Sequence, residues 1–436
     1  MHPVSHIARI GNREAFGGPH VQDGARRADV LTSVGFKRIF ALDPGLGPIP
    51  GHWATYARKL SGAFRELELD IVLCGNRQQE PRILDGLTVE PLFSLTPYER
   101  YGEDPHNPPT ALAAFQRQTA QFADDLEKLE AFGLSSQDLL IFFTVYPQIL
   151  GGLIEWTRRR PERRNQRVAL LMQFAEEVNV YEKARGAHGD VFYVDYYRRI
   201  MPPGEGRHAH PHWRYFSASP GLGDLFSALL GKDVRPLPMP GSASWPPLRR
   251  RAAGDPIAVA LLGHTSIAKG GFLLPEIIET TLAQFPNVRF NLHLSTNPDT
   301  RELDERFAEG NDRLRILRGY ISDDEIQGII DDSDIVLLPY QAPKYRMMPS
   351  AIFIQAACSG KIVVLPAGSH MHRELLLRGG GGTLFHEHTA AAIDKALWSA
   401  IDDVDRLSRL AAAAAPAHRE VNSPNAYVKR ILDSFA

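Results

Sequence analysis

The stretch SDIVLLPYQAPKYRMMPSAIFIQAACSGKIVVLPAGS, residues 333–369, decides the fold that this sequence predicts. It contains two apolar, strand-like runs with a short helical segment between them, and parallel strands require such a crossover. Both runs lead into polar turns that contain Gly or Pro, at the edge where parallel sheets bind ligands. Because Lys344, Tyr345, Arg346 and Ser350 lie in these turns, we expect a binding site there.

The same alternation continues in both directions from this stretch. A strand-like run at 37–43, a helical pattern at 52–67 and a second run at 69–75 form a βαβ unit. A proline-dense segment at 234–256 interrupts the alternation, because packed elements tolerate few prolines. We therefore predict two doubly wound, Rossmann-like α/β domains that face each other across a cleft. The predicted parts are an N-terminal extension at 1–36, a first domain at 37–238, a linker at 239–256, a second domain at 257–415, and a C-terminal helix at 416–436 that packs back toward the first domain.

The composition sets limits on the class of protein. The 436 residues suit two domains of roughly 200 residues each. The formal net charge of −2 gives no indication of a nucleic-acid partner. Cys74 and Cys358 lie in apolar surroundings and are expected to be buried and reduced. Without an apolar signal core or a run of about 20 apolar residues, we expect a cytoplasmic protein.

Two segments of the second domain indicate a phosphate site. In LLGHTSIAKGGF, residues 261–272, Gly263 permits a tight exit turn and Lys269 precedes the next helix. Cationic side chains and the free N–H groups of a helix N-terminus both favour phosphate. Ser350 is expected to cap a second helix, with the amide of Ala351 free beside it. A capped helix whose loop charges face water remains the alternative from the residues alone.

Residues 257–385 resemble the donor-binding domain of GT-B glycosyltransferases, close to family 4. The resemblance rests on the order of LLGHTSIAKGG, RGYISDDEIQGIIDDSDIVLLPY, YRMMPSAIFIQAACSGKIVVLPAG and GGTLF. The first domain is similar only in architecture and in its first loop, DPGLGPIPGHW. The resemblance implies a nucleotide-sugar donor bound by the second domain and a saccharide or lipid-linked glycan acceptor on the side of the first.

The resemblance also implies roles for individual residues. Lys269 would contact the donor diphosphate, and Ser350 with the Ala351 amide would hold its distal phosphate. Gln355 takes the place of the second glutamate of a Glu-seven-residues-Glu pair and would bind the ribose. The backbone of Tyr320 and Ile321 would hold the base, while Gly47 and His52 would approach from the first domain. The expected donor site is Gly47, Gly263, His264, Lys269, Tyr320, Ile321, Lys344, Tyr345, Arg346, Ser350, Ala351 and Gln355.

The sequence departs from the family pattern at several of these positions. Met347 stands where the first glutamate of the pair is expected, and His264 replaces an arginine. The histidine often found after the fourth strand of the first domain is absent, and FFTVYP offers Thr144 and Tyr146 instead. A glutamine still donates to and accepts from ribose hydroxyls, so donor binding remains compatible with Gln355.

The resemblance implies retention of the anomeric configuration without a bound metal or another cofactor. A donor phosphate oxygen would take the acceptor proton, so the main task is to stabilise the departing diphosphate. The predicted catalytic residues are Lys269, Arg346 and Glu177. Glu176 and Glu177 end a strand near the cleft, and solvated loop charge is an equally good interpretation of both.

Two further clusters have a structural and a functional interpretation. His208, His210 and His212 alternate as metal ligands on a strand would, but a polar loop is favoured. An arginine-rich segment at 158–167 ends a helix, where cations suit the dipole. Its functional interpretation is contact with anionic lipid at the inner face of a membrane. These arginines are Arg158, Arg159, Arg160, Arg163, Arg164 and Arg167.

The sequence therefore predicts a family-4-like, hexosyltransferase-like enzyme of polysaccharide biosynthesis. One alternative is a catalytically weakened relative that binds nucleotide-sugar or partners an active transferase, motivated by Met347 and Gln355. A sugar-nucleotide epimerase with the same fold is the other alternative, although it is expected to carry more cleft carboxylates.

Overall fold

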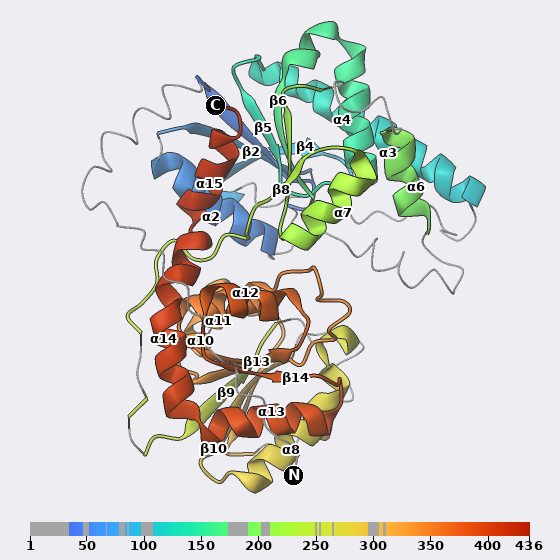
Figure 1. Ribbon diagram of the computed structural model, residues 1–436. Coiled ribbons are helices and arrows are strands. Elements are labelled where there is room, and N and C mark those ends of the chain that lie inside the picture. Colours follow the sequence, from blue (N-terminus) through green and yellow to red (C-terminus); the bar gives the residue numbers. More distant parts are fainter. Residues whose placement is uncertain are drawn as a thin grey trace, which may run out of the picture.

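The computed structural model describes residues 35–46, 52–66, 68–77, 83–84, 87–96, 108–172, 191–201, 210–248, 251–252, 254–263, 266–294, 305–307 and 311–436. They form two α/β units, each built on its own largely parallel sheet with helices on both faces (Figure 1). The predicted fold class of two doubly wound domains is confirmed.

The first sheet has the strand order β3-β4-β2-β1-β5-β6-β7-β8, and its pairs are parallel apart from the antiparallel pair β3–β4. Alternate side chains of β1 serve different cores, because successive residues of a strand point to opposite faces. Phe40 and Leu42 pack with α3, α4 and α7, whereas Ile39 and Ala41 pack with α2 and α15. The elements are β1 (Arg38–Leu42), α2 (His52–Glu66), β2 (Asp70–Asn76), β3 (Ile83–Leu84), β4 (Leu87–Phe93), α3 (Pro108–Glu127), β5 (Leu139–Phe142), α4 (Pro147–Arg159), β6 (Arg167–Met172), α6 (Val191–Ile200), β7 (Trp213–Ser217), α7 (Pro220–Leu230), β8 (Val234–Pro236) and α15 (Pro424–Asp433).

The second sheet has the order β11-β10-β9-β12-β13-β14, and all its pairs are parallel. The chain leaves β9 toward β10 and later returns on the other side of β9 at β12, so the strand order reverses between these two strands. Ligands of open α/β sheets bind at the carboxyl ends of such a pair. The elements are β9 (Ile257–Leu261), α8 (Leu274–Gln284), β10 (Val288–Leu294), β11 (Leu314–Arg318), α10 (Asp323–Asp331), β12 (Ile335–Leu337), α11 (Ala351–Cys358), β13 (Ile362–Pro366), α12 (His370–Arg378), β14 (Gly382–Phe385), α13 (Ala390–Asp402) and α14 (Val404–Val421).

The helices begin where the sequence provides caps. Ser350 Oγ accepts from the Phe353 N–H at 3.3 Å, as expected for the start of α11. Ser423 caps α15 with Pro424 in its first turn, which is also as expected. At α10, Ser322 and Glu325 form a reciprocal capping box. Such caps satisfy amides that have no partner within a helix.

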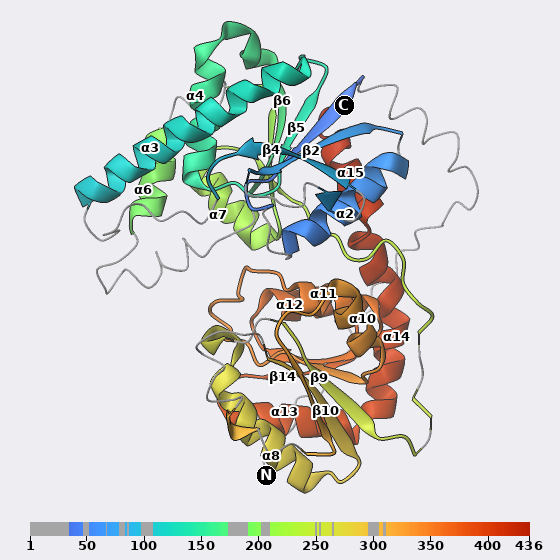
Figure 2. The ribbon, with the colours of Figure 1, turned by 180° about the vertical axis from the view of Figure 1, so that it is seen from behind.

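The last two helices join the two units. Helix α14 runs along the second unit, and α15 packs against α2 of the first (Figures 1 and 2). The rings of Tyr56 and Tyr427 meet edge to face with centroids 6.4 Å apart, and Arg214 Nε donates to the Ser434 carbonyl at 2.6 Å. Within the described residues, the chain passes between the units at the crossover after β8 and again between α14 and α15.

Two further features concern the membrane and the cysteines. Within the described residues, no helix has both the length and the apolar character that a membrane span requires. Cys74 and Cys358 are free and buried, as expected from their surroundings.

Candidate functional site

The loops that follow β9 and β12 are locked together at the edge of the second sheet. Gly270 has a φ of +73°, and a Cβ built there would lie 2.2 Å from the Pro339 carbonyl oxygen. The Gln341 N–H donates to the Ala268 carbonyl at 3.0 Å. Only glycine fits this position, because its φ is left-handed and the Pro339 carbonyl leaves no room for a Cβ. The contact therefore holds the loop that carries the preceding residue, Lys269.

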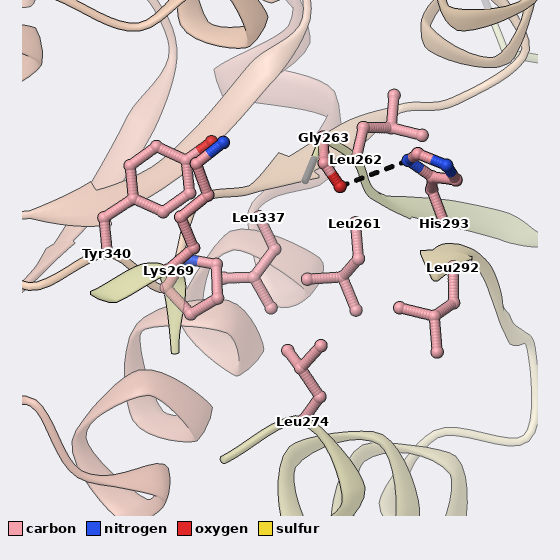
Figure 3. A pocket seen from close by; sticks show the side chains of 10 residues that line it. Leu261, Leu262, Gly263, Lys269, Leu274, Leu292, His293, Leu337 and Tyr340 are labelled. Atoms are coloured by element: carbon pink, nitrogen blue, oxygen red, sulfur yellow. Dashed lines mark hydrogen bonds between the residues drawn. The ribbon is translucent and has the colours of Figure 1, made fainter. Parts of the chain in front are cut away.

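Lys269 lies at the end of the short 3-10 helix η3 (Ile267–Lys269) and lines a small pocket above the sheet. Its Nζ is 5.6 Å from the centroid of the Tyr340 ring. Figure 3 shows the amine beside that ring, with His293 across the pocket. Burial lowers the pKa of Lys269 to about 8, and repulsion from Lys344 adds to the shift. An anion at this position would stabilise the charged amine.

The N-terminus of α11 approaches the same place. The Ile354 N–H donates to the Ser350 carbonyl, so the amides of Ala351 and Ile352 precede the first bond within the helix. A Cβ built at Gly263 would lie 3.4 Å from Lys269 Nζ and 3.5 Å from Ile352 Cγ1. Gly263 therefore sits between the lysine and the first turn of α11. The structure brings a cation and free helix amides to one edge of the sheet.

The loop before α11 is held by aromatic packing. Tyr340 and Tyr345 are buried, with ring centroids 4.4 Å apart, and the Tyr345 carbonyl accepts from the His370 N–H. Burial raises the pKa of Tyr340 to about 12. Tyr345 thus anchors the loop, while Arg346 is exposed on it.

Gln355 has an unusual environment. It is 8% exposed, and its Oε1 is buried without a hydrogen-bond partner among the described residues. An unsatisfied buried acceptor costs about 1–3 kcal/mol, so a ligand hydroxyl that donates to it would be stabilised. The ribose contact that the resemblance implies stays a prediction, because Gln355 is not among the residues that line the pocket around Lys269.

His293, at the end of β10, was missed by the sequence analysis. Its Nδ1 lies 3.1 Å from the Gly263 carbonyl oxygen and its Nε2 lies 2.8 Å from that of Gly319. The ring therefore braces the exit of β9 against the loop that carries Tyr320 and Ile321. Tyr320 is 61% exposed beside the buried Ile321. The only sequence signal was a polar ring in the apolar run LHL.

Met347 connects the two units. Its carbonyl accepts from Ser219 Oγ at 2.6 Å, and a Cβ built at Gly221 would lie 2.9 Å from Met347 Cγ. Met347 and Met348 also pack against the core that contains α3, α4 and α7. This contact explains an apolar residue at position 347. A carboxylate there would be partly desolvated where it packs against the start of α7, and this desolvation costs free energy.

The first unit contributes a buried carboxyl group that the sequence analysis also missed. Asp43, directly after β1, accepts from the Gly45 N–H at 2.9 Å and from Thr144 Oγ1 at 3.4 Å. Burial raises the pKa of Asp43 to about 7 despite these two bonds. Thr144 follows β5, the neighbour of β1, so the pair marks the carboxyl edge of the first sheet.

Several expected residues lie outside the described part of the chain. They are Gly47, Glu176, Glu177, His208 and His264, and for His52 the structure describes the backbone at the start of α2 but not the side chain.

The histidine cluster at 208–212 and the arginine-rich segment at 158–167 contain residues that pack against neighbouring side chains. His210 stacks on Trp213 with ring centroids 3.8 Å apart, and burial lowers its pKa to about 4. Within the described residues, no three His, Cys, Asp or Glu side chains gather as a metal would require. Arg163 is buried over the Trp156 ring and paired with Glu127 and Glu130 of the α3 region. This arginine therefore holds α4 against α3.

Comparisons with known proteins agree on the architecture. No protein-family model matches the sequence, and no curated protein does. Sucrose-phosphate synthase from Thermosynechococcus elongatus superposes with a TM-score of 0.66 at 14% identity, over 92% of this chain and 98% of that one. HepE from Anabaena, in complex with UDP and glucose, gives 0.61 at 14% identity over 92% and 99%. The catalytic domain of starch synthase IV from Arabidopsis thaliana, bound to ADP and acarbose, gives 0.60 at 13% identity over 91% and 99%. The chain thus has the two-domain fold of the GT-B glycosyltransferases.

Proposed function

We propose that this protein is a retaining, family-4-like glycosyltransferase. It moves a sugar from a nucleotide-diphosphate sugar to a saccharide or glycan acceptor and requires no metal ion. The observation that carries the proposal is the meeting of Lys269 and the first turn of α11 around Gly263. A diphosphate placed there gains a full positive charge and two free amides.

The rest of the donor fits the residues around this point. The buried Gln355 Oε1 has no partner among the described residues and accepts a ribose hydroxyl. The backbone at Tyr320 and Ile321 follows β11, which β10 separates from β9, and His293 supports it. This backbone holds the base. Lys344 and Arg346 add positive charge to the loop above the diphosphate. HepE, which shares the fold, has been seen with UDP-glucose.

The reaction needs no protein carboxylate at position 347. The bond between the sugar and the diphosphate breaks while the acceptor hydroxyl attacks from the same face. Its proton passes to the departing phosphate oxygen, and Lys269 stabilises the charge that develops there. Met347 can therefore serve as a contact between the units without removing the means of catalysis.

The acceptor lies toward the first unit. Its strand ends carry Asp43 and Thr144, and Glu177 follows β6 in sequence. If the acceptor is lipid-linked, Arg158 at the end of α4 and Arg164 in the 3-10 helix that follows provide exposed cations for anionic headgroups.

A thermal-shift screen of UDP-, ADP- and GDP-sugars tests donor binding, because a ligand stabilises the folded state by mass action. One donor class is expected to raise the Tm, and Lys269→Ala should abolish the shift. Lys395→Ala, an exposed lysine on α13, removes the same charge elsewhere and should keep it. A donor shift that survives in Lys269→Ala would contradict the assigned site.

A binding protein without transferase activity is the second candidate, favoured by the packing of Met347 against Gly221. The two functions differ in turnover. Release of nucleoside diphosphate from the donor that gives the thermal shift, in the presence of saccharide acceptors, supports the transferase. Saturable binding without release across the acceptor panel supports the binding protein.

A further inference from the structure

A second cavity of about 300 Å³ lies at the joint between the two units. Its walls come from the turn between β7 and α7, from the crossover after β8, from α11 and α12 of the second unit, and from the break between α14 and α15. Both connections between the units that the structure describes therefore contribute to this cavity. Its size suits a compact metabolite.

This cavity is distinct from the pocket around Lys269, and Ser350, an expected donor residue, borders it. Phe353 and Ile354 of α11 line it, whereas Ile352 faces Gly263 beside Lys269. At 3.6 residues per turn, Gln355 shares the Ile352 side of the helix and not the side of Phe353 and Ile354. The two cavities share no lining residue, and Ser350 at the start of α11 lines the second one.

The polar side of the cavity carries two arginines. His370, Glu374 and Arg378 lie four residues apart on α12, and Arg430 comes from α15. Arg378 forms a close ion pair with Glu374. Arg430 Nη1 donates to the Val421 carbonyl at 3.1 Å. Burial lowers the pKa of Arg430, repulsion from Arg378 lowers it further, and the charge of Glu420 opposes both.

The charges around the cavity favour an anion. Most of the lining is apolar, and its charged groups are two guanidinium groups and one carboxylate, Glu374, with Glu420 acting on Arg430 from nearby. An anion bound between the arginines would relieve their repulsion. Guanidinium is well matched to phosphate, because its N–H groups form a fork that binds two oxygens. Glu374, His370 and Asn422 also line the cavity and provide partners for hydroxyl groups.

We propose that this cavity binds a small phosphate monoester with a hydroxylated body, of the size of a hexose phosphate. The phosphate lies between Arg378 and Arg430, and the hydroxyls contact the polar groups of α12 and Asn422. The ligand acts as an effector and not as the donor, because it occupies the Phe353 and Ile354 face of α11, away from Lys269.

Occupancy links the two units and the donor site. The ligand contacts α15, which packs on the first unit, and α12 and α11 of the second. Since Ser350 borders the cavity and caps α11, a ligand that favours one arrangement of the units changes donor affinity, and the donor changes effector affinity equally. This coupling rests on the proposed function, whereas effector binding does not.

Calorimetric titration of the full-length protein without donor tests effector binding. The probes are glucose 6-phosphate, glucose and inorganic phosphate. Glucose 6-phosphate should bind wild type, Arg430→Gln should weaken it at least about tenfold, and glucose should not bind. Lys429→Gln, an exposed neighbour on α15, removes the same charge and should leave binding unchanged. Lys269→Ala should also leave it unchanged, which distinguishes this site from the donor site.

A second variant tests the site independently, in case Arg430→Gln does not fold. Leu377 lines the cavity but is 73% exposed, so Leu377→Glu adds a repelling charge at the rim without disturbing the core. Weaker glucose 6-phosphate binding in this variant, with unchanged thermal unfolding, supports the site. The proposal is overturned if wild type does not bind glucose 6-phosphate or if Arg430→Gln and Leu377→Glu both bind it normally. Inorganic phosphate that binds equally tightly would overturn the hydroxylated class of ligand.

Discussion

The carboxyl edges of the two sheets are built for different charges. In the second unit, Lys269 and the start of α11 offer positive charge and free amides, held by the contact of Gly270 with Pro339. In the first unit, burial favours the neutral form of Asp43 beside Thr144. We propose that the edge of the second unit neutralises an anion and that the edge of the first unit forms hydrogen bonds with a polar molecule. The proposed difference between the edges follows from the residues at the strand ends.

The largest expected effect concerns the contact that holds the cationic edge. Gly270→Ala places a Cβ 2.2 Å from the Pro339 carbonyl oxygen at a φ of +73°. The backbone must shift, and we expect a loss of about 3–5 kcal/mol in the free energy of unfolding. Denaturant unfolding measures it. Gly254→Ala is the matched control, because Gly254 also has a positive φ of +89° but open space around it. Equal losses in the two variants would show that the loop contact contributes nothing.

Asp43→Asn tests the neutral edge through the pH dependence of stability. The pKa of Asp43 is raised to about 7 in the folded protein, so the folded state binds more protons than the unfolded state between about pH 4 and 7. Wild-type stability should therefore fall as the pH rises through this range, by at most about 4 kcal/mol from this group. Asp43→Asn should be more stable than wild type at pH 8 and similar at pH 4.

Exposed Asp224→Asn on α7 is the control for this comparison and should follow wild type at both pH values. Should Asp43→Asn parallel wild type in urea unfolding at pH 4 and pH 8, Asp43 is ionised in the folded protein and the contrast between the edges fails.

A substitution at Ser219 tests the contact between the first unit and the loop before α11. Its Oγ donates to the Met347 carbonyl across the units and accepts from the Leu222 N–H as the cap of α7. Ser219→Ala loses both, and we expect about 2 kcal/mol less stability. Ser423→Ala loses only a cap and should cost about 1 kcal/mol. Thermal unfolding that shows the same loss for both variants would argue against the bond to Met347.

The smallest expected effect concerns Gln355. Gln355→Ala removes an acceptor that has no partner in the described part of the protein. The substitution therefore breaks no hydrogen bond of this oxygen, and we expect little loss of stability in the protein without donor. Donor affinity should fall about tenfold, because a ribose hydroxyl loses its partner. Titration with nucleoside and 2′,3′-dideoxynucleoside diphosphates checks the cause: the variant should bind both equally, and wild type should prefer the ribose form.

The sequence predicted the elements better than the contacts between them. The apolar runs gave most of the parallel strands, and Ser350 and Ser423 cap the helices as expected. These features depend on a few neighbouring residues, so local patterns reveal them. The short antiparallel strand β3 was not predicted, because two residues are too few for a periodic signal.

The residues that were missed act over long separations in the chain. His293 braces Gly263 against Gly319, and Met347 meets Ser219 across the units. Asp43 looked like part of a turn, and only its burial beside Thr144 gives it an unusual pKa. No spacing rule brings such residues together, because their contacts depend on how the two sheets are placed. The roles of the expected donor residues themselves remain predictions.

The central claim is that Lys269 neutralises a nucleoside diphosphate at the carboxyl edge of the second sheet. The most direct test is calorimetric titration with UDP, ADP and GDP at pH 7 and pH 9.5, with the tightest of the three followed in variants. The pKa of Lys269 is about 8 in the protein without ligand, so the amine loses its charge between these pH values. The affinity of wild type for the nucleoside diphosphate should therefore fall as the pH rises. Lys269→Ala should bind about 100-fold more weakly and without this pH dependence, while Lys395→Ala should match wild type. Wild-type affinity and pH dependence retained in Lys269→Ala would contradict the account.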